Sequence, residues 1–137
     1  MKYLGLDLGT KTLGIATSDK NGLIASAYKV IRHDEDYDYL IDEVSNIKDE
    51  LCIDAIVLGF PKMMNNDIGP RGNMSIKFKD MLEERLRIPV YLEDERLSTK
   101  QAEDILIKNN TRRNKRRKVI DKMAAVIILQ SYLDRKE

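Results

Sequence analysis

The chain has 137 residues, of which 42% are hydrophobic and 34% are charged, and its formal net charge is +1. This length and composition suit one globular domain with its own core, which we expect to span residues 1–137. Cys52 and His33 are the only cysteine and the only histidine, which excludes an internal disulfide and a Cys/His zinc site. The sequence shows no signal peptide and no apolar stretch of bilayer-spanning length, so we expect a cytoplasmic protein without membrane contact.

The first part of the chain predicts three strands, over residues 3–8, 13–18 and 24–31. Each is a short run of strand-forming residues, and polar or glycine-containing turns separate them, including a hairpin turn over 19–22. Three strands joined by turns this short predict an antiparallel meander.

Beyond the meander, helical and strand-like spacing of the apolar residues alternate along the chain. The expected elements are a helix over 37–51, a buried strand over 55–59, a loop over 61–73, a helix from 74 that ends before Pro89, a strand over 90–92, and helices over 99–110 and 119–135. This order predicts an α/β fold with a five-stranded mixed sheet flanked by helices.

Acidic residues stand at two strands of this expected sheet. Asp7 interrupts the apolar strand Leu-Gly-Leu-x-Leu, where a buried carboxylate needs a metal ion, a cation or several donors. The alternative is that Asp7 caps the turn at 9–11. Asp94 and Glu95 follow the fifth strand, and strand alternation lets one of them face a site at the strand ends. The alternative there is a polar strand end paired locally with Arg96.

A third acidic position, Asp121, is expected in the first turn of the last helix, where the helix dipole favours an ionised carboxylate. Stabilisation of that helix end is the alternative interpretation. Together, Asp7, Glu95 and Asp121 offer oxygen ligands without histidine or cysteine, a set that favours Mg²⁺ or Mn²⁺ over zinc. One or two such ions suit the activation of water for phosphodiester cleavage.

Positive charge is concentrated in one segment just before Asp121. Residues 112–118 carry six positive charges, which leaves −5 on the rest of a chain whose total is +1. The basic residues are Arg112, Arg113, Lys115, Arg116, Arg117 and Lys118. The segment predicts contact with a polyanion, and a solvated connection between two helices is the alternative. With no Trp and two Phe, the chain has little base-stacking capacity, so we expect it to recognise RNA or DNA by backbone and shape.

Several motifs follow one another in the order found in a known family. They are Gly5–Lys11, Gly14–Ala16, Ser18–Asp19, Val57–Pro61, Gly69–Arg71, Asp94–Thr99, Ile120–Asp121, Ala124–Ala125 and Ile128–Asp134. On these motifs the chain resembles the YqgF family over essentially its whole length. The resemblance implies an RNase H-like fold related to Holliday junction resolvases. It also implies a nuclease that matures the 5′ end of pre-16S ribosomal RNA in ribosome biogenesis.

The resemblance further implies roles for individual residues. Asp7, Glu95 and Asp121 would be the catalytic acids and would bind the metal. Related resolvases have an acid after the fourth strand, where this chain has Gly59–Pro61, so Glu95 would replace it. The implied phosphate contacts outside the basic segment are Lys11, Arg71 and Arg96. Alternatively, Lys11 is an exposed lysine in a turn and Arg71 a solvated loop residue. The alternative for Arg96 is an ion pair with an acid.

Three other functions are compatible with the sequence. A DNA junction resolvase would apply the same chemistry to branched DNA instead of structured pre-rRNA. A non-catalytic RNA-binding or ribosome-assembly factor would keep the basic segment but show no metal dependence. Residues 7–10 also resemble the phosphate loop of the actin and sugar-kinase superfamily, whose members need two such domains around a cleft. The sequence leaves open whether the chain forms a homodimer.

Overall fold

The computed structural model describes residues 1–61, 69–94 and 113–136, and of Arg71 and residues 113–122 it describes the helical backbone. The strands are β1 (Tyr3–Leu8), β2 (Thr12–Ser18), β3 (Ala25–Arg32), β4 (Ala55–Phe60) and β5 (Val90–Asp94). The helices are α1 (Tyr37–Leu51), α2 (Pro70–Leu86) and α4 (Arg113–Arg135). The helix expected over 99–110 lies outside the described residues.

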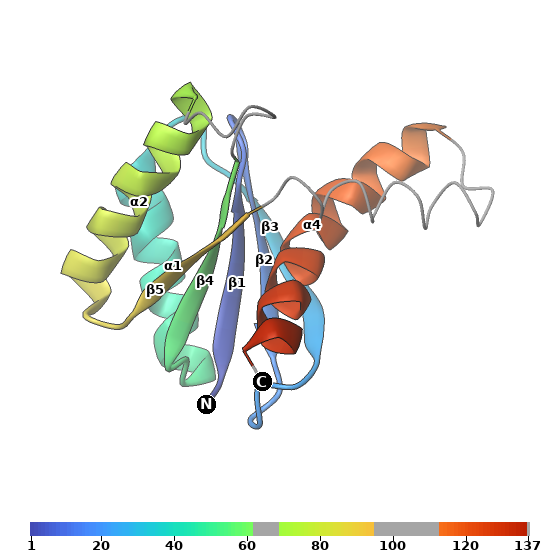
Figure 1. Ribbon diagram of the computed structural model, residues 1–137. Helices are drawn as coiled ribbons and strands as arrows, with labels where there is room; N and C mark the ends of the chain where they lie inside the picture. Colours follow the sequence, from blue (N-terminus) through green and yellow to red (C-terminus); the bar gives the residue numbers. More distant parts are fainter. Residues whose placement is uncertain (62–68, 95–112, 137) are drawn as a thin grey trace.

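The five strands form one sheet in the order β3-β2-β1-β4-β5 (Figure 1). β2 pairs antiparallel with both β1 and β3, whereas β4 is parallel to β1 and to β5. The expected meander and the expected five-stranded mixed sheet are therefore confirmed. Because β1, β4 and β5 are parallel, their last residues lie along the same edge, which we call the carboxyl edge.

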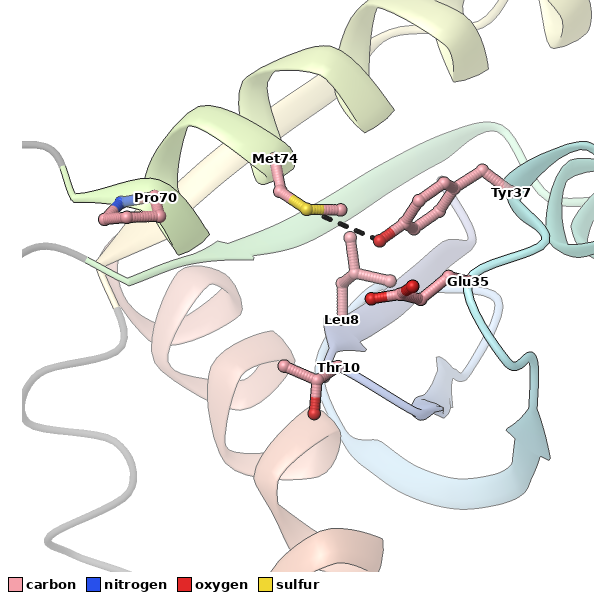
Figure 2. Close-up of a pocket in the computed structure, with 7 residues that line it drawn as sticks. Leu8, Thr10, Glu35, Tyr37, Pro70 and Met74 are labelled. Carbon is pink, nitrogen blue, oxygen red and sulfur yellow. Dashed lines mark hydrogen bonds between the residues drawn. The ribbon is translucent and has the colours of Figure 1, made fainter.

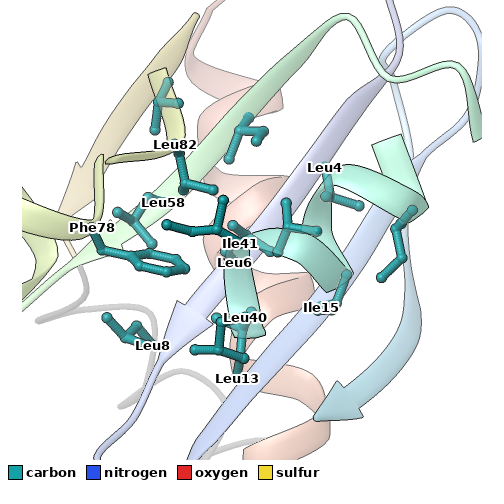
Figure 3. Close-up of a cluster of buried hydrophobic side chains, with 14 of the residues drawn as sticks. Leu4, Leu6, Leu8, Leu13, Ile15, Leu40, Ile41, Leu58, Phe78 and Leu82 are labelled. Atoms are coloured by element: carbon teal, nitrogen blue, oxygen red, sulfur yellow. The ribbon is translucent and has the colours of Figure 1, made fainter. Parts of the chain in front are cut away.

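Helices cover both faces of the sheet, with α1 and α2 on one face and α4 on the other (Figure 1). Leu4, Leu6 and Leu8 of β1 belong to the larger core, which they share with side chains of α1 and α2 (Figure 3). Tyr3 instead belongs to a smaller core with Leu129 and other residues of α4. Alternate residues of β1 thus point to opposite faces, as strand geometry requires.

Gly5 is where α4 packs most closely on the sheet. A β-carbon at this position would lie 2.7 Å from the β-carbon of Leu129 and 3.1 Å from the carbonyl oxygen of Ala125. No ordinary β-carbon contact is that short, so any larger residue would push α4 away from β1. Glycine at this position therefore sets the distance between the helix and the central strand.

The helix α2 begins at Pro70, four residues before the expected start at Met74. Gly69 is its N-cap, and a proline in the first helical turn is well suited to helix initiation because its missing N–H would have no partner there. The predicted loop over 61–73 is therefore wrong for residues 70–73, and residues 62–68 lie outside the described residues. Arg71, expected in that loop, lies in the first turn of α2 instead.

The helix α4 begins at Arg113, six residues before the expected start. Residues 113–118 are therefore helical, and the alternative that the basic segment merely connects two helices is wrong for these residues; Arg112 lies outside the described residues. Asp121 comes more than two turns after the start of α4, so the argument that the helix dipole favours its charge is also wrong.

No described helix is apolar over a length that would cross a membrane.

The close contact at Gly5 makes a direct prediction. Gly5→Ala should lower the free energy of unfolding by about 1–3 kcal/mol, because an overpacked core must shift to make room. Chemical denaturation of the purified variant would measure this loss. Ser26→Ala on the exposed part of β3 is the control and should change stability little. A Gly5→Ala variant as stable as the wild type would show that α4 is not held at this distance.

Candidate active site at the carboxyl edge

Asp7 faces α4 near the carboxyl end of β1. Its neighbours Leu6 and Leu8 point into the core on the opposite face, so alternation turns the half-buried Asp7 side chain towards α4. Its carboxylate makes no hydrogen bond or ion pair with any residue that the structure describes. The alternative that Asp7 caps the following turn is therefore wrong, because the Gly9 amide closes that turn by donating to the carbonyl oxygen of Thr12 at 2.8 Å.

The backbone of α4 leads from Gly5 towards the level of Asp7. Tyr3 contacts Tyr132, and Gly5 adjoins Ala125, so α4 runs antiparallel to β1. Asp121 precedes Ala125 by four residues, or about one helical turn. The fold therefore places the backbone at residue 121 towards the end of β1 that carries Asp7.

Alternation along β5 separates its two consecutive acids, Glu93 and Asp94. Tyr91 stacks on Tyr132 and Glu93 forms an ion pair with Arg135, so both face α4. Asp94 is the next residue of the strand and is turned to the opposite face. Glu95 and Arg96 lie outside the described residues.

Glu93 is a buried acid that the sequence analysis did not single out. Its side chain is only 2% exposed, and its carboxylate accepts a hydrogen bond from the guanidinium of Arg135 in the last turn of α4. Glu93 pairs in register with Gly59, and Leu58 pairs with Leu6, so Glu93 and Asp7 stand nearly level on the α4 face. The alternation of side chains along β5 was the signal that would have predicted a buried side chain at Glu93.

His33 holds the β1–β2 turn against the loop that precedes α1. Its backbone amide donates to the carbonyl oxygen of Lys11 at 3.0 Å. In its buried ring, Nδ1 accepts from the amide of Glu35 at 2.9 Å, so Nε2 carries the proton that it donates to the carbonyl oxygen of Gly9 at 2.9 Å. The sequence indicated only a structural or incidental role for His33, and the structure shows that it fixes the turn directly after Asp7. The side chain of Lys11 is exposed on this turn and makes no ion pair with the described residues.

A pocket opens beside this turn, on the α1–α2 side of the sheet (Figure 2). Its volume is about 190 Å³, and the described residues that line it are Leu8, Gly9, Thr10, Glu35, Tyr37, Pro70 and Met74. The hydroxyl of Tyr37 donates to the sulfur of Met74 at 3.4 Å across the pocket. Burial, and secondarily the nearby charge of Glu35, raises the pKa of the Tyr37 hydroxyl above its ordinary value. Sequence patterns gave no sign of the pocket, because its walls come from three separate segments of the chain.

The ligand chemistry of the α4 face fits a hard divalent cation. Asp7 offers a carboxylate without a partner among the described residues, and carboxylates are the ligands that Mg²⁺ and Mn²⁺ favour. Within the described part of the chain no three acidic, histidine or cysteine side chains gather as a complete metal site. Two of the three expected ligands fall outside that search, since Glu95 and the side chain of Asp121 are not described.

Comparisons with known proteins agree with this geometry. A family model described as "RuvX: Holliday junction resolvase" matches residues 1–135. A Bacillus licheniformis protein named "Putative pre-16S rRNA nuclease" is 54% identical over 135 residues, covering 98% of this chain and 97% of that protein. The structure of Thermus thermophilus RuvC in complex with a Holliday junction substrate aligns with a TM-score of 0.61 at 15% identity, over 99% of this chain and 96% of that one. The fowlpox virus Holliday junction resolvase aligns with a TM-score of 0.56 at 14% identity, over 100% of both chains.

The fold is therefore the RNase H-like fold of the Holliday junction resolvases, as the resemblance implied. A mixed sheet with an acid near the end of its central strand is the part of this fold that the described residues display. The chain belongs to the RuvX family, and the resemblance to the YqgF family is confirmed.

The contacts of His33 lead to a stability prediction. His33→Ala should lower the free energy of unfolding by about 1–3 kcal/mol, because it leaves the Gly9 carbonyl and the Glu35 amide without their partner. His33→Asn is the matched variant, since its side-chain oxygen can still accept from the Glu35 amide, and it should lose less. Thermal and chemical unfolding would rank the two variants. Equal losses would show that the bond to Glu35 does not hold the turn.

Proposed function

We propose that this chain is a metal-dependent endonuclease that hydrolyses phosphodiester bonds in structured RNA, at the 5′ end of pre-16S ribosomal RNA. The observation that carries the proposal is the carboxylate of Asp7, which faces α4 at the carboxyl edge and has no partner among the described residues. The name of the Bacillus licheniformis relative, at 54% identity over nearly the full chain, supports RNA as the substrate. Branched DNA is the second candidate, supported by the description of the family and by the fold of the structural neighbours.

In this proposal Asp7, Glu95 and Asp121 together bind one or two Mg²⁺ or Mn²⁺ ions. Such an ion would supply charge stabilisation at the phosphate and make water a better nucleophile. Asp7 is fixed by the central strand, and the contact of α4 with Gly5 directs the helix backbone that carries Asp121 towards the same level. The protein's contribution is thus to hold the carboxylates in place before substrate arrives.

Strand alternation supports Glu95 rather than Asp94 as the third acid. Asp94 belongs to β5 and is turned away from α4, the face on which Asp7 lies, which leaves Glu95 as the acid that we propose. Glu93 also faces α4, but its carboxylate is already paired with Arg135. A carboxylate neutralised in this way is a weaker metal ligand than a free one.

The basic start of α4 supports contact with nucleic acid. The positive helix terminus disfavours cationic side chains, and no acidic residue lies in the first turn of α4 to offset them. Arg113, Lys115, Arg116 and Arg117 therefore stand where helix stability alone would not place them. We propose that they, with Arg112, bind the phosphate backbone, and that Lys11, Arg71 and Arg96 contact phosphates nearer the cut.

The sugar-kinase alternative has less support than the nuclease. Its proteins need a second domain of the same kind to form their cleft. The family match extends over residues 1–135 of this chain, and it identifies a family of resolvases. A purely structural RNA-binding role does not explain why the carboxylate of Asp7 has no partner in the described part of the chain.

Asp7→Asn tests the catalytic proposal directly. Cleavage in the presence of Mg²⁺ or Mn²⁺ should fall by about a hundred-fold or more, because a metal contributes several kcal/mol of transition-state stabilisation. The unfolding midpoint should not fall, since the carboxylate has no partner among the described residues to lose. The assay would compare a pre-16S rRNA 5′-end fragment with a four-way DNA junction, with and without chelator.

The matched control for this assay is Asp80→Asn, which removes one negative charge from the exposed surface of α2. It should cleave at the wild-type rate. Unchanged cleavage by Asp7→Asn, or cleavage that survives the chelator, would contradict the metal mechanism. Cleavage of the DNA junction alone would establish the second candidate substrate.

A second experiment tests the start of α4 as the nucleic-acid contact. Replacing Arg113, Arg116 and Arg117 together with Gln should weaken RNA binding. It should also reduce the slope of log affinity against log salt by about 0.7 for each lost contact with single-stranded RNA. The reason is that every neutralised phosphate releases counterions. Fluorescence anisotropy at several salt concentrations measures the slope, and an unaltered slope would exclude these residues from the interface.

A further inference from the structure

The pocket lined by Tyr37, Met74 and Glu35 opens on the face of the sheet opposite to Asp7. One residue of its wall is nevertheless the neighbour of Asp7 in the sequence. Leu8 lines the pocket, and Asp7 is the residue before it on the opposite face of β1. Their α-carbons are about 3.8 Å apart, as for any consecutive residues. A nucleotide chain that crosses the carboxyl edge at this strand would therefore meet the candidate metal ligand and the pocket within one or two nucleotides.

We propose that this pocket binds one unpaired guanine base of the substrate, next to the phosphate that is cut. The inference rests on the proposed nuclease function and adds base selection to it. The sequence suggested recognition by backbone and shape alone, because aromatic residues are few. The structure places one of those few, Tyr37, in a pocket at the carboxyl edge.

The walls of the pocket suit a flat, weakly polar ring. Leu8, Pro70 and Met74 contribute apolar surface, and the ring of Tyr37 adds an aromatic face. Tyr37 is itself held in place, since it packs against the ring of His33 at 5.6 Å and the ring of Phe78 at 6.2 Å between centroids. Unstacked bases of single-stranded RNA bind in this way to aromatic side chains.

Glu35 supplies the polar group at the rim. Figure 2 shows its carboxylate directed towards Leu8 and the interior of the pocket. Both Asp34 and Glu35 have positive φ angles, 45° and 68°, which residues other than glycine seldom adopt. The loop keeps this unfavourable backbone because the Glu35 amide donates to His33 and the Asp36 amide donates to the His33 carbonyl oxygen. The Glu35 carboxylate forms no hydrogen bond or ion pair with the described residues, so it is available to a ligand.

A carboxylate at the rim selects among the four bases by hydrogen bonding. It accepts hydrogen bonds through both oxygens, and guanine alone presents two adjacent donors, N1–H and the N2 amino group, on its Watson–Crick edge. Adenine, cytosine and uracil each present at least one acceptor beside their donor. That acceptor would face a negative oxygen, so the pocket disfavours these bases as well as favouring guanine.

The test measures binding without cleavage, so its result does not depend on the nuclease proposal. Twelve-nucleotide uridine strands that carry a single central G, A or C are titrated against the wild-type chain without divalent metal. The G strand should bind about ten-fold tighter than the A and C strands, and Glu35→Gln should remove most of that difference. Glu35→Gln replaces one acceptor oxygen with an amide that cannot accept from guanine.

Asp34→Asn is the matched control, because it removes the same charge from the neighbouring residue, which does not line the pocket. It should keep the preference for G. A wild-type chain without base preference, or a Glu35→Gln variant with the wild-type preference, would overturn the inference. Either result would leave the cleavage assay with Asp7→Asn unaffected, so the two proposals fail separately.

A spectroscopic measurement locates the bound base. On addition of 5′-GMP, the methyl resonance of Met74 should shift, while that of Met123 on α4 should not. 5′-AMP at the same concentration should shift Met74 less. Equal shifts with both nucleotides would show a pocket that binds bases without selecting guanine, and would overturn the proposed role of Glu35.

Discussion

The packing of α4 on the central strand through Gly5 is the constraint on which the rest of the site depends. A β-carbon at residue 5 would meet Leu129 at 2.7 Å, so only glycine lets the helix lie this close. The smaller core of Tyr3, Val57 and Leu133 forms around that contact. Because α4 runs antiparallel to β1, seating it at Gly5 directs its earlier turns towards the carboxyl edge. The place of the helix, and not only its sequence, therefore determines what stands opposite Asp7.

Two acids on the α4 face differ in whether a described cation compensates their charge. Glu93 is buried and paired with Arg135, so the ion pair fastens the last turn of α4 to β5. Because Glu93 is buried while Arg135 is largely exposed, removing Arg135 would leave the buried carboxylate without its compensating charge, which is costly. Asp7 stands nearly level with Glu93 but has no such partner among the described residues. The contrast separates a carboxylate that holds the fold together from one that is free to bind a cation.

His33 connects the turn between β1 and β2 with the loop before α1. Through Gly9 it fixes the turn that follows Asp7, and through the Glu35 amide it fixes the loop that carries the rim of the pocket. One imidazole therefore holds together the turn that follows Asp7 and the loop at the rim of the pocket. A substrate strand that crossed the carboxyl edge would meet a surface held rigid by buried hydrogen bonds.

Sequence patterns determined the elements and their order, because hydrophobic periodicity reflects which residues must be buried. The meander, the mixed sheet and the position of Asp7 within β1 were all predicted from local spacing. The starts of α2 and α4 were not, since residues 70–73 and 113–118 contain no apolar residues at helical spacing that would mark a helix. Lysine and arginine form helices readily, so a polar segment without apolar residues can still be helical.

The pairings between distant residues were decided by the tertiary structure alone. No local pattern indicates that Glu93 meets Arg135, that His33 accepts from Glu35 while donating to Gly9, or that Tyr37 and Met74 enclose a pocket beside Leu8. These contacts depend on how α1, α2 and α4 pack against the sheet, which the linear spacing of residues does not specify. The sequence by itself determined that an acid would stand at the end of the central strand. The packing of the helices decided that its carboxylate would face α4, and that a pocket would open on the other side of the same strand.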